Sequence, residues 1–184
     1  EPLNKKDMYS FIYPEDSEID RVGIRGIFMN NYIYWEANDH LDLMIKEYGF
    51  ELNEEGFERT YRKGSSLDNI YENGVHDYMK FVKFGYGRAS DHGCKDIRAG
   101  KLTRDQAIKE LRNRDHIKSK DLKIWLEYVG WTEKKFNEVA DTFRDPRVWW
   151  IKDGQWWKNN IWGQPSCYGQ VYLKKDNWTK FYIE

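Results

Sequence analysis

Basic side chains are concentrated between residues 83 and 104, in the stretch KFGYGRASDHGCKDIRAGKLTR. The stretch has six basic residues against two acidic ones, Asp91 and Asp96, although the formal net charge of the whole chain is −1. Such a local excess of positive charge indicates an anionic ligand. Lysine and arginine suit phosphate, because lysine is a mobile point charge and arginine a bidentate donor. The basic residues are Lys83, Arg88, Lys95, Arg98, Lys101 and Arg104.

Four of the polar residues in this stretch have the spacing of a single helix face. Arg88, Asp91, His92 and Lys95 are separated by three, one and three positions, so a helix between Gly87 and Gly100 would align them. This face could be a site that combines an anion-binding cation with an acid and a base. It could also be an ordinary solvated face, whose ion pairs contribute only about 0.2–0.5 kcal/mol each.

The elements around this stretch are predicted to be mainly helical, and the fold class is an α/β remnant. Residues 22–35 (VGIRGIFMNNYIYW) are rich in β-branched and aromatic residues and predict one or two short strands. Apolar spacing predicts helices over about 39–48, 75–84, 104–113, 122–129 and 133–143, which together form a helical bundle. Thr103 with Gln106 has the pattern of a capping box, and Thr132 is predicted to cap the helix over 133–143. Residues 51–74 are predicted to be mostly loop.

The composition changes after residue 147. Six of the nine tryptophans lie in 149–184, and we divide the chain into a helical part, 1–150, and an aromatic tail, 151–184. The end of the tail predicts a hairpin with its turn at 175–177. The indoles have two interpretations: they stack on sugar rings or a partner protein, or they pack over the helices and complete the core.

Composition excludes several classes of protein. The chain has 184 residues, enough for one domain with or without an appendage, and 40% of them are hydrophobic. No run approaches the ~20 apolar residues of a membrane span. The near-neutral net charge argues against a general nucleic-acid coat protein and leaves local basic patches open. Cys94 and Cys167 lack the spacing of a metal site, so no metal site is expected. The chain begins EPLNKKD, which suggests a processed or partial chain.

Several segments in this order resemble the C-terminal half of the N-acetyl sugar amidotransferases of bacterial surface-polysaccharide and pseudaminic-acid biosynthesis. The resemblance covers residues 20–150, and its most specific part is KFGYGRASDHGCKDIR. The other segments are GIRGIFMNNYIYWE, EYGFE, HDYMKFV, AGKLTRDQAI and EYVGWTEKKFNEVADTFRDPRVW. These enzymes belong to the PP-loop ATP pyrophosphatases. The resemblance implies that ATP activates the N-acetyl group of an amino sugar, which ammonia then converts to an acetamidino group.

One departure from that family is large. The ATP-binding fingerprint SGGKDS is absent, and so is the N-terminal cysteine cluster of many members. The resemblance therefore implies a C-terminal part that does not hydrolyse ATP alone and that works with an N-terminal PP-loop half. The complete enzyme would bind ATP and Mg²⁺, act in the cytoplasm, and receive ammonia from HisH-like glutaminase and HisF-like cyclase subunits.

The roles of individual residues are hypotheses within that resemblance. His92 would shuttle a proton as ammonia adds, and Asp91 would orient His92 or hold Mg²⁺. Four basic residues would bind phosphate or the developing negative charge: Lys83, Arg88, Lys95 and Arg98. For Arg98, neutralisation of a helix C-terminus is an equal alternative.

Two aromatic residues could line the substrate pocket. Tyr34 and Trp35 end a predicted strand and precede a predicted helix, and ligands bind at the carboxyl ends of strands in open α/β sheets. The alternative is that both side chains belong to the core.

Two other functions remain open at this point. The first is a PP-loop relative that acts on tRNA, in which the basic stretch would contact RNA phosphates. The second is a non-catalytic module that binds carbohydrate or protein through its aromatic tail.

Overall fold

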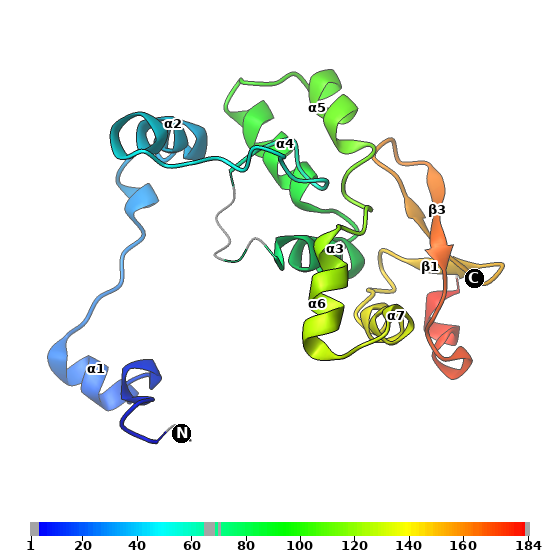
Figure 1. Ribbon diagram of the computed structural model, residues 1–184, viewed down its shortest axis with the longest axis horizontal. Helices are drawn as coiled ribbons and strands as arrows, with labels where there is room; N and C mark the ends of the chain where they lie inside the picture. The colour runs from blue at the N-terminus through cyan, green and yellow to red at the C-terminus, as the bar shows by residue number, and fades with distance from the viewer. Residues whose placement is uncertain (1–3, 65–68, 70, 183–184) are drawn as a thin grey trace. The chain divides into compact units, whose positions relative to one another are not determined.

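The computed structural model describes residues 4–64, 69 and 71–182. By its internal contacts the chain divides into two units, one up to Asn38 and one from Asp39 onward. Within the described residues there are seven α-helices and one small antiparallel sheet, which confirms the predominantly helical fold class with short strands (Figure 1). The predicted division at residue 150 stays a prediction.

The first unit contains the helix α1 (Asp16–Val22) and two short 3-10 helices, Tyr9–Phe11 and Met29–Asn31. The strands predicted near 22–35 are not formed, and that prediction is wrong. A strand requires a partner for its backbone donors and acceptors, and no described segment pairs with these residues. The apolar side chains that suggested buried strands, such as those of Ile24, Phe28 and Tyr32, are exposed.

The second unit contains most of the helices. α2 (Ala37–Tyr48) begins just before it, and α3 (Asn73–Phe84), α4 (Arg88–Arg98), α5 (Arg104–Leu111), α6 (Asp121–Val129) and α7 (Glu133–Asp141) follow. α3 contacts α4, α6 and α7, and α4 also packs on α5 (Figure 1). All the predicted helices therefore exist, because their apolar spacing and end signals are local properties of the sequence.

The capping signals are confirmed in detail. The backbone N–H of Gln106 donates to Thr103 Oγ1, and the Gln106 side chain accepts from the Thr103 backbone, which completes the capping box of α5. Thr132 caps α7 by accepting from the backbone N–H of Lys135.

A glycine allows α4 to pack closely on α5. A Cβ atom on Gly93 would lie 2.9 Å from Leu111 Cδ1 and 3.5 Å from the Cβ atom of Ala107. Gly93 costs about 1 kcal/mol relative to alanine inside a helix, and this close approach explains its presence. The small buried cluster of Ala89, Ala107 and Leu111 forms at the same contact.

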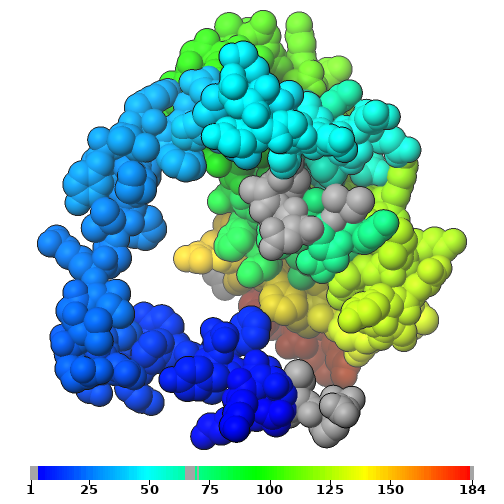
Figure 2. Space-filling view, turned by 60° about the vertical axis from the view of Figure 1, so that its left-hand side comes forward, coloured from blue at the N-terminus to red at the C-terminus, as the bar shows by residue number. Residues whose placement is uncertain are grey.

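The segment between α2 and α3 contains no described helix or strand, only an isolated bridge between Phe57 and Thr60, as the loop prediction for 51–74 required. Part of it, residues 65–68 and 70, lies outside the described residues. Its described portion, cyan in the figures, crosses α4 in Figure 1, and Figure 2 shows cyan atoms lying over green ones.

The sheet lies in the C-terminal part of the chain. Its strands are β1 (Trp150–Lys152), β2 (Gln155–Asn159) and β3 (Pro165–Gln170), antiparallel in the order β1-β2-β3. The buried residues of this region form one cluster with a residue of α3, and the cluster comprises Phe81, Trp149, Ile151, Trp156, Val171, Leu173 and Phe181. Most of this aromatic cluster thus comes from the C-terminal segment.

The hairpin predicted at 175–177 is wrong, because this segment forms two 3-10 helices, Lys175–Asn177 and Thr179–Phe181. These turns bury Phe181 against Trp156, with ring centroids 4.9 Å apart, and Trp178 Nε1 donates to the carbonyl of Leu173 at 2.8 Å. Burial of the aromatic rings therefore decides the conformation of the tail.

No helix in the described part of the chain combines the length and the apolar character that crossing a membrane requires.

The glycine after α3 yields a test of this packing. Gly85 has φ +74°, and a Cβ atom there would lie 2.5 Å from Val148 Cγ1 and 2.9 Å from Lys158 Cε. Gly100 has φ +71° with nothing within 4 Å of such a Cβ atom. Gly100→Ala should cost about 1 kcal/mol of unfolding free energy from its backbone conformation alone. Gly85→Ala should cost about 1–3 kcal/mol more, from steric overlap.

Urea denaturation of both variants measures the difference. Equal losses would contradict the close packing of the α3 end on β2.

Candidate functional site

α4 begins after Gly87 and ends at Arg98, within the predicted span. Gly87 precedes it in an extended conformation, and a Cβ atom on Gly87 would lie 2.8 Å from Asp115 Oδ1. The aligned polar face predicted from the spacing is therefore present, and its environment determines what it can do.

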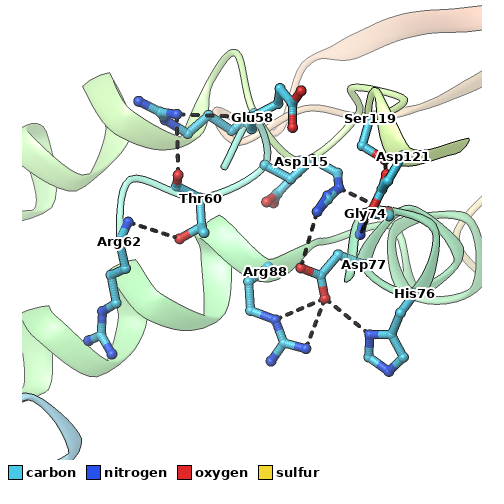
Figure 3. Close-up of polar contacts among 12 residues, drawn as sticks. Glu58, Thr60, Arg62, Gly74, His76, Asp77, Arg88, Asp115, Ser119 and Asp121 are labelled. Carbon is cyan, nitrogen blue, oxygen red and sulfur yellow. Dashed lines mark hydrogen bonds and ion pairs between the residues drawn. The ribbon is translucent and has the colours of Figure 1, made fainter. Parts of the chain in front are cut away.

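A buried carboxylate, that of Asp77 on α3, is the centre of the polar network beside this face. Only 5% of Asp77 is exposed. Its Oδ1 accepts from Arg88 Nε at 2.9 Å and lies 2.8 Å from Arg88 Nη2, and the ring of His76 contacts the same oxygen at 3.1 Å. Figure 3 shows both side chains pointing at this carboxylate. Two nitrogens of Arg88 are thus occupied by Asp77.

A second arginine reaches Asp77 from the opposite side. Arg59 is 2% exposed, its Nη2 lies 3.6 Å from Asp77 Oδ2, and its Nε donates to the carbonyl of Gly74 at 2.9 Å. Burial lowers the pKa of Arg59, while Asp77 and Asp121 oppose that shift. Asp121 accepts from the backbone N–H of Gly74 at 2.5 Å, and Figure 3 shows Asp121 beside Gly74. The network therefore joins the 57–64 segment to α3, α4 and α6.

His92 is held by a different neighbour. Its Nδ1 lies 2.6 Å from Thr60 Oγ1, which also accepts from the Arg62 backbone N–H at 3.3 Å. Burial is the main cause that lowers the pKa of His92 to about 4; the charges of Arg62, Arg88 and Lys95 contribute in the same direction, and Asp91 opposes the shift. The imidazole is thus neutral at pH 7, and it is a weaker base than the ordinary histidine that the proton-shuttle hypothesis assumed.

Asp91 pairs with Lys80 of α3 and lies 3.9 Å from Arg88 Nη1. A carboxylate with these partners is already neutralised. Within the described residues there is no group of three histidine, cysteine, aspartate or glutamate side chains that could hold a metal ion.

A small pocket opens where these side chains meet. Thr60, Asp77, Arg88 and His92 line it together with Asn73, the first residue of α3. Asn73 is 2% exposed, and neither Nδ2 nor Oδ1 of its side chain has a partner among the described residues. A buried amide without partners is costly. The pocket has a volume of about 20 Å³, the size of one water molecule, so it suits one small group that both donates and accepts hydrogen bonds.

The structure brings some predicted site residues together and leaves others apart. Arg88, Asp91 and His92 share one half-buried network, and Lys95 is near enough to affect the pKa of His92. Lys83, Lys95 and Arg98 are exposed. Lys83 Nζ lies 5.2 Å from the centre of the Phe84 ring.

Tyr34 and Trp35 belong to the first unit, where they are 78% and 59% exposed. Their proposed part in a substrate pocket stays a prediction.

Sequence reasoning missed the partners of α4. Asp96, which faces the protein interior from α4, accepts from Tyr61 Oη and from Arg62 Nη2, the latter at 2.5 Å. Burial is the main cause that raises the pKa of Tyr61, and the hydrogen bond to Asp96 raises it further. Arg59, Thr60, Tyr61 and Arg62 lie in a segment predicted to be loop, and the alternation of aromatic and basic residues in FERTYRK was the available signal.

A family model described as "LPS biosynthesis protein WbpG-like, C-terminal domain" matches residues 57–161. The match contains the whole polar network, from Arg59 to Asp121. No curated protein matches the chain.

The network predicts a strong effect for Asp77→Asn. Loss of the shared carboxylate charge leaves the buried Arg59 without its counterion, so the unfolding free energy should fall by about 3 kcal/mol. Asp91→Asn, at a more exposed ion pair with Lys80, should cost about 1 kcal/mol or less. Guanidinium denaturation measures both, and a loss at Asp77 no larger than at Asp91 would rule out Asp77 as the organising carboxylate.

The lowered pKa of His92 predicts a pH dependence. His92 takes up a proton near pH 6.5 in the unfolded chain but only near pH 4 in the folded chain. The unfolded state therefore binds more protons between these pH values, and the free energy of unfolding should fall as the pH drops from 6.5 to 4. His92→Gln should reduce that fall. NMR titration of the His92 ring provides the direct measurement, and a midpoint near 6.5 would contradict burial of the imidazole.

Proposed function

This chain belongs to the family of LPS biosynthesis protein WbpG-like C-terminal domains, and we propose that it is the C-terminal part of an ATP-dependent amidotransferase acting on an N-acetyl amino sugar. Membership in this family identifies the chain as part of a polysaccharide biosynthesis protein with a sugar-modifying role. The amidotransferase reaction is our further step. It is supported by the match of residues 57–161, which coincides with the buried polar pocket beside α4.

The pocket has the donors and acceptors that an acetamido group requires. The Asn73 side chain can accept from the N–H of such a group and donate to its oxygen, because neither of its polar atoms has a partner among the described residues. His92, neutral at pH 7, presents an uncharged ring beside Asn73. We propose that these two side chains bind and orient the N-acetyl group.

The charged residues have a supporting role in this proposal. Asp77 holds Arg88 in one orientation through two of its nitrogens. The guanidinium therefore adds positive potential to the pocket, but these two nitrogens are not free to bind a phosphate. In the reaction ATP converts the amide oxygen into a leaving group and ammonia replaces it.

We propose that the PP-loop half supplies most of the ATP and Mg²⁺ contacts, since Asp91 is paired with Lys80 and Arg88 with Asp77. HisH-like glutaminase and HisF-like cyclase subunits would deliver the ammonia in the cytoplasm.

The test is a reconstituted reaction. The chain is co-expressed with a PP-loop half, supplied with ammonia and an N-acetyl amino sugar, and assayed for AMP. Asn73→Ala should lower kcat/KM for the sugar at least tenfold, through loss of a buried hydrogen-bonding group.

A matched control is available in α7. Asn137 is also a buried asparagine, but its Oδ1 accepts from Lys118 Nζ at 2.8 Å and it does not line the pocket. Asn137→Ala should lower stability and leave kcat/KM unchanged. AMP formation that does not depend on the sugar would refute the proposed reaction.

A further inference from the structure

A second cleft lies between the end of α3, the connection from α5 to α6, and strands β2 and β3. Its wall contains Arg112, Asp115 and His116 from the connection, Lys158 from β2 and Tyr168 from β3, with Trp162 at its rim. An adjoining hollow shares Arg112, His116, Trp162 and Tyr168, so the two are continuous. The cleft shares no lining residue with the pocket beside α4.

Lys158 is an unusual feature of this cleft, because its ammonium is buried and forms no direct ion pair among the described residues. The residue is 8% exposed, and its Nζ donates to the carbonyl of Asn159 at 2.5 Å. Among the described residues no carboxylate lies within ion-pair distance of Nζ; Asp115, on the same wall, is near enough only to oppose the lowering of the Lys158 pKa by burial. A buried charge normally has a partner of opposite sign, so the missing partner indicates an anionic ligand.

Aromatic rings surround this ammonium. Nζ lies 4.9 Å from the ring centre of Tyr168, 5.7 Å from that of Phe81 and 5.9 Å from that of Trp149. Cation–π attraction of this kind offsets part of the burial cost and leaves the positive charge available to a ligand. Gly85 provides the space, since a Cβ atom there would lie 2.9 Å from Lys158 Cε.

The other polar groups of the cleft complement this charge. Arg112 and His116 add donors on the same wall, and the His116 ring lies 6.0 Å from the Tyr168 ring at 71°. Asp115 is the one carboxylate among the residues that line the cleft, and it accepts from Ser90 Oγ at 2.5 Å and from the Ser90 backbone N–H at 3.3 Å. It can also accept from ligand hydroxyls, while the exposed Trp162 ring offers a stacking face.

We propose that this cleft is a binding site for a phosphate group carried on a sugar ring, separate from the pocket beside α4. Lys158 and Arg112 contact the phosphate, and Trp162 and Tyr168 contact the ring. The choice of a sugar as carrier rests on the proposed function, whereas the anion site rests on the buried ammonium alone.

Calorimetric titration of the full chain tests the proposal with four probes: inorganic phosphate, N-acetylglucosamine 1-phosphate, UDP-N-acetylglucosamine and neutral N-acetylglucosamine. The sugar phosphate should bind at least tenfold more tightly than the neutral sugar. The affinities for the sugar phosphate and for the nucleotide-linked sugar are then compared. The tighter of the two identifies the natural source of the phosphate.

Lys158→Met should lower the affinity for the sugar phosphate at least tenfold, because it keeps the length of the side chain and removes the charge. Lys152→Met is the matched control, since Lys152 is an exposed lysine of β1 whose Nζ lies 5.5 Å from the Trp157 ring, and it should bind as the wild type does. Arg112→Gln, at an exposed position, tests the same site if Lys158→Met does not fold. Trp162→Ala should weaken binding of the sugar phosphate and leave inorganic phosphate unaffected.

The proposal is overturned if neither phosphate ester binds, if the neutral sugar binds as tightly, or if both charge variants bind as the wild type does. Inorganic phosphate binding equal to that of the sugar phosphate would overturn the sugar part. These results are independent of the AMP assay, so a failure of the amidotransferase reaction with intact phosphate binding refutes the function and leaves this site in place.

Discussion

The architecture around α4 depends on the burial of one carboxylate. Asp77 lies inside the second unit, and its charge is tolerable only because Arg59 and Arg88 approach it from two sides. Arg59 comes from an irregular segment and Arg88 from the first turn of α4, so a single carboxylate links both to α3. Neutralisation of the Asp77 charge explains how a segment without helix or strand is held against three helices. Because the members of the network share this carboxylate, loss of one member should weaken the others.

This constraint changes the meaning of the basic stretch from 83 to 104. Charge counting treats each cation as available to a ligand, but in the structure Arg88 is occupied by Asp77, and Lys101 lies 2.9 Å from Asp39. Lys95 and Arg98 are exposed outside the pocket, whereas inside it the amide of Asn73 and the neutral ring of His92 are uncharged. The pocket therefore offers uncharged hydrogen-bonding groups rather than free cations.

A buried cation that forms no direct ion pair within the described part of the chain lies elsewhere, at Lys158. The rings of Phe81, Trp149 and Tyr168 surround it, and Phe81 and Trp149 belong to the same buried cluster as Trp156. Arg144 stacks on both of these indoles, 4.0 and 4.7 Å from their centres, and pairs with Asp141 of α7. The tryptophans thus provide an apolar environment of low dielectric constant, in which electrostatic interactions are stronger than in water.

The sequence by itself determined the features that depend on neighbouring residues. Apolar spacing located α3 and α5 to α7, and the polar residues between Gly87 and Gly100 located α4. Thr103 and Thr132 marked two helix starts, and the family resemblance carried by KFGYGRASDHGCKDIR indicated surface-polysaccharide biosynthesis. Tertiary structure decided what depends on distant residues. Residues 22–35 have strand composition but no partner strand in the described chain, and Arg59 meets Asp77 across 18 positions. Helix signals are local hydrogen bonds and periodicities, whereas strand pairing, buried ion pairs and the isolation of Lys158 exist only once separate segments have packed together.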